Sequence, residues 1–451
     1  MTKSKYITSP IPSKKIPEGI PYILTNEAAE RFSFYGMSSI LVIFMTHYLM
    51  GRDGMLNVMG GEQAKTWFHF FKSAVYLTPI LGALLADIWA GKYRTILFFS
   101  LVYCGGFCAL TLDQTRVGLV VGLVLMAIGS GIIKPCVSAN VGDQFGKSNQ
   151  HLMAKVYGWF YFAINLGAFV SMFFCPWLQQ EYGPRVGFGV PAVFMLIATA
   201  AFRLGREKFV HVPASGIGFV RECFSGEGLR AILKLSIIYV FVAMFWALFD
   251  QSQSAWVLQA ENMDRHIFGF ELLPEQPQAF NSLLVMLLIP IFSYVIYPVI
   301  DKIFPLTALR KISLGLFVAG LSFVVPAWVE TQIVAGLKPN IVWQLFAYVI
   351  LTAAEVMVSI TCLEFSYTQA PKKMKSFIMA VFLLSISLGN AFTGAVNYFI
   401  KNEDGTSKLA GASYYWFFTV MMLITAVIFI FVAAGYREKT YIQDEGGGRG
   451  D

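Results

Sequence analysis

Charged residues are scarce in this chain. Asp, Glu, Lys and Arg make up 14% of its 451 residues, whereas soluble proteins average about 25%. Hydrophobic residues reach 56% and the mean hydropathy is +0.61. This composition excludes an ordinary soluble enzyme and predicts a protein with many membrane-spanning segments. The net charge of +7 does not indicate a nucleic-acid partner.

Cysteine and histidine are also few, with six and five residues. No Cys-x-x-Cys pair has a His partner, so we expect no metal and interpret the cysteines as small membrane-helix residues. The stretch M-T-K-S-K-Y-I-T-S-P-I-P-S-K-K has no apolar core, so we expect no cleavable signal peptide. We interpret the final G-G-G-R-G-D as linker or tag. A nucleophile–base pair or an H-E-x-x-H motif is lacking, so we expect neither an enzyme nor a cofactor.

Long apolar runs are abundant. A helix needs about 20 apolar residues to cross the hydrocarbon core of a membrane. Twelve runs meet this requirement and predict twelve transmembrane helices in an all-α membrane protein. They lie near 24–50, 67–90, 95–112, 117–141, 154–178, 185–204, 230–258, 277–300, 308–328, 340–367, 376–400 and 412–435.

The basic residues predict the orientation. About two thirds of the 34 Lys and Arg residues fall on the side of the N-terminus, so both termini are expected in the cytoplasm. The basic, Gly-rich connection 205–229 separates a six-helix bundle at 1–204 from a second at 230–436, with a cytoplasmic tail at 437–451. This is the major facilitator architecture. The connection is too short for an extra helix pair.

Several charges lie inside predicted spans. Glu27, Glu30 and Arg31 share one helix face, and Lys134 in G-S-G-I-I-K-P lies at a similar depth. Charges at membrane depth usually face a cavity and have partners, so we expect these four to meet. Either they mark a transport path, or they form a purely structural ion-pair knot.

The second half has isolated polar residues. Asp250 and Glu355 each lie alone in a span. Burial without a cation favours the protonated form of a carboxylic acid, so each is a candidate proton carrier. Asn165 and Asn281 need a partner in the membrane and can line the same cavity.

His69 and Lys72 lie one turn apart in the second span. His69 is either an interfacial packing residue or a switch. For Lys72, we expect the amine to snorkel outward.

Six motifs together resemble the proton-coupled oligopeptide transporter family of the major facilitator superfamily. The first is E-A-A-E-R-F-S-F-Y at 27–35, similar to the family's E-x-x-E-R-F-x-Y-Y. The second begins at Tyr76, reads Y-L-T-P-I-L-G-A-L-L-A-D-I-W-A-G-K-Y-R-T-I and contains Asp87 and Gly91. The third is G-I-I-K-P around Lys134, and the fourth is W-F-Y-F-A-I-N-L-G-A at 159–168. The fifth is F-W-A-L-F-D-Q with Asp250, followed by N-S-L-L-V-M-L-L-I-P-I-F with Asn281, and the sixth is L-E-F-S-Y-T-Q-A-P-K-K-M-K-S at 363–376.

The resemblance implies a function and roles for particular residues. The protein would import di- and tripeptides together with protons, by alternating access, as an integral plasma-membrane protein. We expect it to work as a monomer. The implied peptide-binding residues are Arg31 and Lys134 for the carboxylate, Glu355 with Asn281 and Asn165 for the amine, and Tyr35, Tyr76 and Phe382 as pocket lining. The implied proton-coupling residues are Glu27, Glu30, Asp250 and His69.

The sequence departs from the family at three places. The family usually has an Arg at the position of Ser38 that can pair with the span-seven acid. Asp250 therefore lacks that partner, and His69 or Lys72 can replace it. Phe382 stands where a Trp often lines the pocket, and Ile360 stands near an expected Pro, which puts the hinge of span ten in doubt.

Two other function classes remain open. A related facilitator could carry nitrate or a drug-like solute, although Glu355 argues against nitrate, which has no amine. An intramembrane enzyme or receptor would need a catalytic cluster or a folded domain outside the membrane, and the sequence lacks both.

Overall fold

The structure is a computed structural model and describes residues 6–214, 216, 226–369, 375–402 and 407–436. Among these residues, eleven helical stretches are long and apolar enough to cross a membrane. They correspond to eleven of the twelve predicted spans. The first span also forms a helix, which carries the three charges of Glu27, Glu30 and Arg31. The many apolar helices agree with the prediction of a membrane protein.

Every regular element of the first half of the chain is helical in its described part. Short π-helical and 3₁₀ segments, labelled η, interrupt or extend the α-helices. The elements are α1 (Ile20–Ile43), η1 (Phe44–Tyr48), α2 (Gly61–Leu77), α3 (Pro79–Leu85), η2 (Ala86–Ala90), α4 (Lys92–Leu112), α5 (Arg116–Asp143), η3 (Gln150–Leu152), α6 (Met153–Tyr182), α7 (Pro184–Leu204) and η4 (Gly205–Glu207).

The second half adds a small hairpin to its helices. Its elements are α9 (Gly226–Phe249), η5 (Asp250–Gln253), α10 (Ala255–Ala260), β1 (His266–Ile267), β2 (Phe270–Glu271), η6 (Gln276–Gln278), α11 (Ala279–Ile291), η7 (Phe292–Ile296), α12 (Tyr297–Ile303), α13 (Ala308–Val334), α14 (Val342–Glu355), η8 (Val356–Ile360), α15 (Thr361–Gln369), α16 (Lys375–Ile400) and α17 (Ala412–Gly435).

The hairpin is the one departure from an all-α fold within the described residues. β1 and β2 are antiparallel, with Ile267 opposite Phe270. Phe268 and Gly269 both have positive φ angles, which is the geometry of the tight turns that join such strands. The sequence did not predict these strands because two residues are too few to show an alternating pattern.

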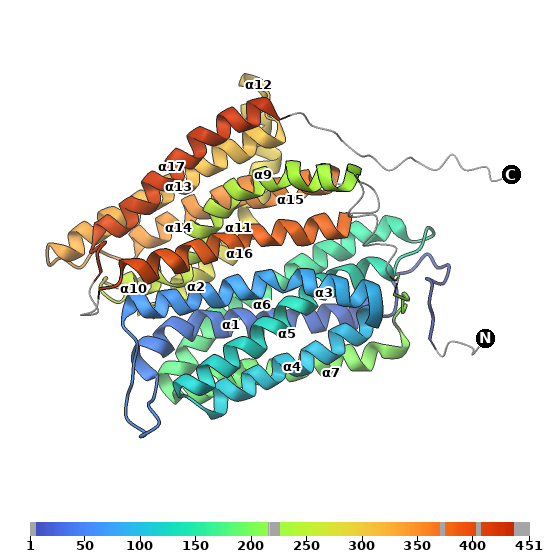
Figure 1. Cartoon of the computed structure of the whole chain (residues 1–451), viewed down its shortest axis with the longest axis horizontal. Helices are drawn as coiled ribbons and strands as arrows, with labels where there is room; N and C mark the ends of the chain where they lie inside the picture. Colours follow the sequence, from blue (N-terminus) through green and yellow to red (C-terminus); the bar gives the residue numbers. More distant parts are fainter. Residues whose placement is uncertain (1–5, 215, 217–225, 370–374, 403–406, 437–451) are drawn as a thin grey trace.

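Two large apolar clusters form the core, one in each half of the chain. The first is built from residues between Ile16 and Phe209, joined by Leu258 at its edge, and the second from residues between Ile232 and Tyr436, joined by Tyr76. Figure 1 shows the same division, with α1 to α7 in the lower part of the view and α9 to α17 in the upper part.

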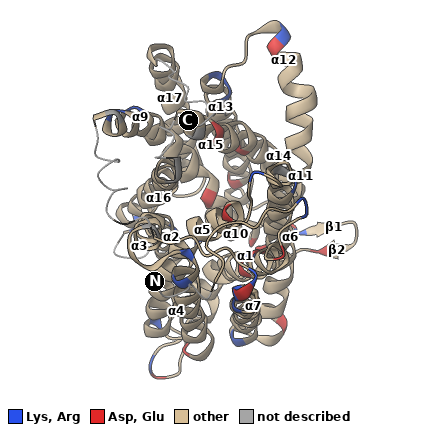
Figure 2. Cartoon of the chain, turned by 90° about the vertical axis from the view of Figure 1, so that its right-hand side faces the viewer, with Lys and Arg blue, Asp and Glu red and all other residues tan. Residues whose placement is uncertain are grey.

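Both ends of the described chain lie on the same side of the molecule. α1 begins there at Ile20 and α17 ends there at Gly435 (Figure 1, right). We call this side the terminal face and the opposite side, where η1 and the β-hairpin lie, the distal face. Figure 2 looks along the helices from the terminal face, and ribbon segments coloured for Asp and Glu lie among the helices near its centre.

Several membrane helices are broken near the middle of the molecule. Span two changes from α2 to α3 at Thr78, because Pro79 lacks an N–H group to continue the helix. Span seven changes from α9 to η5 at Asp250. Span ten lacks the expected Pro, yet the π-helical η8 follows Glu355 directly. This π segment interrupts the regular α-helix of span ten in place of the expected Pro. Such segments often lie at functional sites.

Glycines bring α5 close to its neighbours beside Lys134. A Cβ atom on Gly131 would lie 1.8 Å from Thr78 Oγ1, and one on Gly129 would lie 2.6 Å from Tyr103 Cβ. No side chain fits at either distance. The Gly pair of G-S-G-I-I-K-P therefore permits the close packing of α5 against its neighbours.

Candidate functional site

A buried cluster of charges lies on α1. Arg31 forms ion pairs with Glu30, its neighbour in sequence, and with Glu27, whose Oε1 lies 3.3 Å from Arg31 Nε. All three residues are buried. The two carboxylates compensate the guanidinium charge, and the helix face that they share creates this arrangement locally.

Lys134 approaches this cluster without joining it. Its Nζ lies 4.3 Å from the ring centre of Phe34 and 4.2 Å from that of Tyr76. Within the described part of the chain, no carboxylate oxygen lies within 4.0 Å of Lys134 Nζ. The expectation that all four charges meet is therefore correct for the three on α1, whereas the ammonium group of Lys134 is held by two aromatic rings.

In the second half, Glu355 lies at the helix break of span ten. Glu355 ends α14, and its Oε2 accepts a hydrogen bond of 2.9 Å from Asn281 Nδ2. Asn281 also donates to Thr352 Oγ1 at 3.0 Å. The pair thus links α11 with α14, two neighbouring helices of the second half.

A polar network joins the two halves between α2, η5 and α16. Lys72 Nζ lies 3.3 Å from Asp250 Oδ1, and Asn390 Nδ2 donates to Asp250 Oδ2 at 2.6 Å. His69 Nδ1 lies 2.8 Å from Asn390 Oδ1, and His69 Nε2 lies 2.9 Å from Ser254 Oγ. Asp250 therefore has two partners, one from each half of the chain.

The network assigns the tautomer of neutral His69. The Asn390 amide nitrogen already donates to Asp250 and to Ile386 O, so its oxygen must accept from His69. His69 Nδ1 then carries the proton, and Nε2 accepts from the Ser254 hydroxyl. Protonation of Nε2 would require this hydroxyl to reverse its role and accept instead.

Two expectations about this region, for Lys72 and Phe382, are wrong, and one open alternative is decided. Lys72 is only 1% exposed, so it does not snorkel outward; Asp250 and the rings of Phe34, Phe68 and Tyr76 hold it in place. Of the two residues that could replace the missing arginine, Lys72 pairs with Asp250, whereas His69 reaches Asp250 only through Asn390. Phe382 is 3% exposed and packs against Tyr239 in the second apolar cluster, so it does not line the cavity described next.

A cavity of about 150 Å³ lies between the two halves. Both halves contribute polar side chains to it. Seven of the residues singled out from sequence line it, namely Tyr35, Lys72, Tyr76, Asn165, Asp250, Asn281 and Glu355. Asn165 donates to Tyr161 O in its own helix at 2.9 Å. Arg31 lies directly behind, with its Cζ 6.0 Å from the Tyr35 ring centre.

Sequence reasoning missed three aromatic residues of this cavity, Tyr161, Trp246 and Phe249. Tyr161 stands in the stretch that was singled out for Asn165, and the other two stand in the stretch that was singled out for Asp250. Tyr161 lies four residues before Asn165, one helical turn away on the same face, and this spacing is the signal that could have identified it. Trp246 lies four residues before Asp250 and has the same relationship to it.

Some candidate positions lie outside the described residues. These are the Asp87 side chain, residues 370–374 of the motif at 363–376, residues 215 and 217–225 of the connection and the tail from 437.

A sequence model of the POT family matches residues 93–225 and 217–417, which is more than half of the chain. The chain belongs to the POT family. Peptide transporter family 1 of Drosophila melanogaster is 37% identical over 373 residues, covering 72% of this POT family chain and 49% of the relative. The chain spans about half the length of the curated relatives it matches.

Solved structures of POT family members cover nearly the whole chain. An auto-inhibited POT family peptide transporter is 33% identical, with a TM-score of 0.86, and the match covers 95% of this chain and 99% of the other. The POT family transporter PepTSo is 35% identical, with a TM-score of 0.85 and coverage of 93% and 98%. These matches establish this POT family protein as an integral membrane protein with the POT transporter fold.

Proposed function

We propose that this protein is a secondary active transporter that imports di- and tripeptides together with protons by alternating access. The proposal rests on one observation. The cavity has Arg31 and Lys134 close behind its wall in the first half, whereas Glu355 lines it in the second. Each half thus offers a charge that suits one terminus of a zwitterionic peptide, and the aromatic side chains between them suit variable side chains.

The proposal includes the architecture. Residues 1–204 and 230–436 form two six-helix bundles that rock around the cavity, with 205–229 as the linker and 437–451 as a tail. The two separate apolar clusters support this division. Both termini are cytoplasmic by the distribution of basic residues, so the distal face is external. The protein works as a monomer without a cofactor, and the proton gradient supplies the driving force.

We propose that the coupled protons bind to the acids whose negative charge is least well balanced by nearby cations. Glu27 and Glu30 share the single guanidinium of Arg31, so protonation of one carboxylate frees Arg31 for the peptide carboxylate. Asp250 closes the distal side through Lys72 and Asn390, and its protonation weakens this contact. His69 acts on Asp250 through Asn390.

Uptake into proteoliposomes tests the substrate class. A labelled dipeptide should accumulate when the lumen is alkaline, and peptides with an amidated carboxylate or an acetylated amine should compete roughly ten- to a hundredfold more weakly, because each loses a charged hydrogen bond of about 1.5–3 kcal/mol. Glu355→Gln should reduce the penalty for acetylation more than that for amidation. Glu364→Gln, on the same span but outside the cavity, is the matched control. Equal competition by a doubly blocked dipeptide would exclude this site, and transport of nitrate alone would favour the alternative facilitator.

A further inference from the structure

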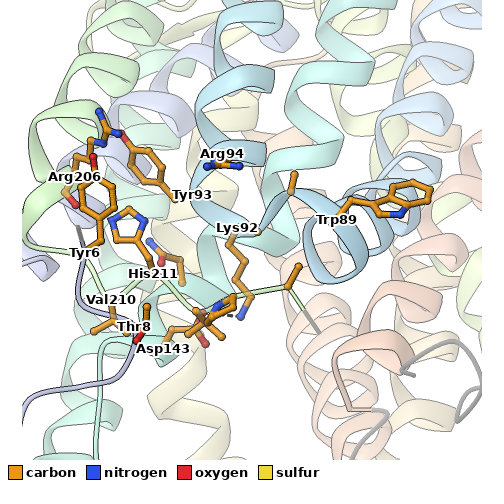
Figure 3. Close-up of a pocket in the computed structure, with 16 residues that line it drawn as sticks. Tyr6, Thr8, Trp89, Lys92, Tyr93, Arg94, Asp143, Arg206, Val210 and His211 are labelled. Carbon is orange, nitrogen blue, oxygen red and sulfur yellow. Dashed lines mark hydrogen bonds and ion pairs between the residues drawn. The ribbon is translucent and has the colours of Figure 1, made fainter. Parts of the chain in front are cut away.

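A second cavity opens on the terminal face, remote from the central one. Its volume is about 340 Å³. The end of η2 and the start of α4 form one wall, the end of α5 another, and the segment 206–214 a third. Tyr6 and Thr8 close it from the N-terminal side. Figure 3 shows these side chains converging on one space from separate elements.

The cavity has an excess of positive charge. Lys92 Nζ lies 2.6 Å from Asp143 Oδ2, so these two charges compensate each other. Arg94 and Arg206 also line the cavity, and neither has a carboxylate within 4.0 Å among the described residues. The Arg206 guanidinium lies over the Tyr6 ring at 4.7 Å. This stacking fixes its plane and leaves its N–H groups at the edge.

Two buried donors in the cavity wall have no acceptor in the described part of the chain. One is Arg206 Nε. The other is Nδ2 of Asn140, a residue that is 3% exposed. The Asn140 oxygen accepts from Gln144 Nε2 at 3.2 Å, which distinguishes the two ends of the amide. Buried donors without acceptors destabilise a protein unless a ligand or water satisfies them.

His211 adds a further polar group. Its Nε2 lies 2.8 Å from Arg206 O, and its ring stacks on Tyr6 with centres 4.6 Å apart. Since a backbone carbonyl only accepts, Nε2 carries a hydrogen and donates to it. Protonation would place a second N–H on Nδ1. The cavity thus combines two uncompensated arginines, an amide donor and a histidine.

We propose that this cavity binds a phosphate group. Guanidinium groups match phosphate oxygens in geometry and charge, and basic pockets between membrane helices accept anionic headgroups. The phosphate belongs either to an anionic phospholipid or to a soluble phosphorylated compound. Trp89 favours the lipid. It borders the cavity, is 73% exposed, and points away from Arg206 in Figure 3, as expected for an indole at headgroup level.

A bound phosphate would fasten four segments together. Tyr6 stacks on His211, and His211 N donates to Ile7 O at 2.8 Å. The ligand would therefore tie the N-terminal segment and the segment 206–214 to the ends of α4 and α5. The measurable consequence is greater thermal stability of the first half, independent of peptide transport.

Thermal melting of the purified full-length protein in neutral detergent tests the site. Phosphatidylglycerol should raise the melting temperature, whereas phosphatidylcholine should not. Arg94→Gln combined with Arg206→Gln should weaken the response about tenfold or more in lipid concentration. Lys147→Gln, an exposed lysine of the same face outside the cavity, should retain it. A second outcome is that inorganic phosphate raises the melting temperature more than chloride does at equal ionic strength. If the double variant loses this effect, the site belongs to a soluble ligand.

Two results would overturn the proposal. One is an equal response of the double variant and Lys147→Gln. The other is the absence of a response of the unmodified protein to both phosphatidylglycerol and inorganic phosphate. If the double variant does not fold, Asn140→Leu and native mass spectrometry of retained lipid replace it: retention equal to that of the unmodified protein counts against the site, and reduced retention supports it. Because none of these readouts involves transport, a failure of the proposed function would not affect them.

Discussion

Lys72 Nζ lies 3.3 Å from Asp250 Oδ1 and joins the first half of the chain to the second. Both side chains are almost fully buried. Ser38 occupies the position where the family resemblance implies an arginine, and the cation that compensates Asp250 comes from α2 in place of α1.

Exchange of the cation between helices tests this relationship. Lys72→Met should impair proton-driven uptake and destabilise the protein, because breaking a buried ion pair costs about 3–5 kcal/mol. Ser38→Arg in this background should restore part of both. Ser38 lies two turns after Arg31 on the same helix face, and α1 packs against η5. Uptake and melting temperature are the measurements. Ser38→Gln, long but neutral, is the control, and an equal rescue by it would contradict the charge argument.

The indirect contact between His69 and Asp250 predicts energetic coupling through Asn390. His69→Gln and Asn390→Ala should have non-additive effects on the pH dependence of uptake, with a coupling of about 0.5–3 kcal/mol, because the two residues share a hydrogen bond of 2.8 Å. His69→Gln with His151→Gln, on the terminal face, should be additive. Strict additivity of the first pair would remove His69 from the mechanism.

Glu30→Gln should separate coupling from binding. The neutral amide imitates a permanently protonated carboxylic acid, so accumulation of peptide against a gradient should disappear while downhill exchange persists. Counterflow and gradient-driven uptake in proteoliposomes measure the two activities. Glu18→Gln, on the surface, should leave both unchanged. If Glu30→Gln still concentrates peptide, the ion pairs on α1 are purely structural.

Glu275 predicts a pH-dependent stability on the distal face. It lines a cavity of about 310 Å³ formed by both halves, and burial raises the pKa of its carboxyl from 4.5 to about 7, with Glu261 nearby adding to the effect. As pH rises from 4.5 to 7, the unfolded chain releases this proton while the folded protein retains it. The folded state therefore loses stability across this window, by up to about 3 kcal/mol.

Glu275→Gln removes that loss. The variant should melt at a higher temperature than the unmodified protein at pH 8 and at the same temperature at pH 4. Glu271→Gln, an exposed residue of the same cavity, should lack this pH-dependent gain. A uniform shift at both pH values would contradict the titration of Glu275 as its cause.

Local patterns predicted the membrane helices and the cluster on α1. Apolar runs of sufficient length make a helix because the hydrocarbon core leaves the backbone no other partner. Glu27, Glu30 and Arg31 meet because their spacing places them on one face. Each of these inferences needs only the residues of one segment.

The partners of His69 and Lys72 could be identified only from the tertiary structure. The two residues are three apart on one helix and therefore face the same way. Their partners Asn390, Ser254 and Asp250 come from helices far away in sequence. Only the packing of α2 against α16 and η5 determines that Lys72 pairs with Asp250 and that His69 forms a hydrogen bond with Asn390.

The remaining errors have the same cause, because the packing of distant helices determines which face of each helix points toward the cavity. Asn390 on α16 faces α2, whereas Phe382 on the same helix faces Tyr239 of α9, so Phe382 is a core residue. Tyr161 and Trp246 line the cavity because α6 and α9 present those faces to each other across it. The sequence by itself determined which segments enter the membrane and which charges they carry, since hydropathy and helix periodicity are local. Only the tertiary structure decided which charges compensate each other, because a buried charge is stabilised by whichever partner the packing of distant helices brings within a few ångströms.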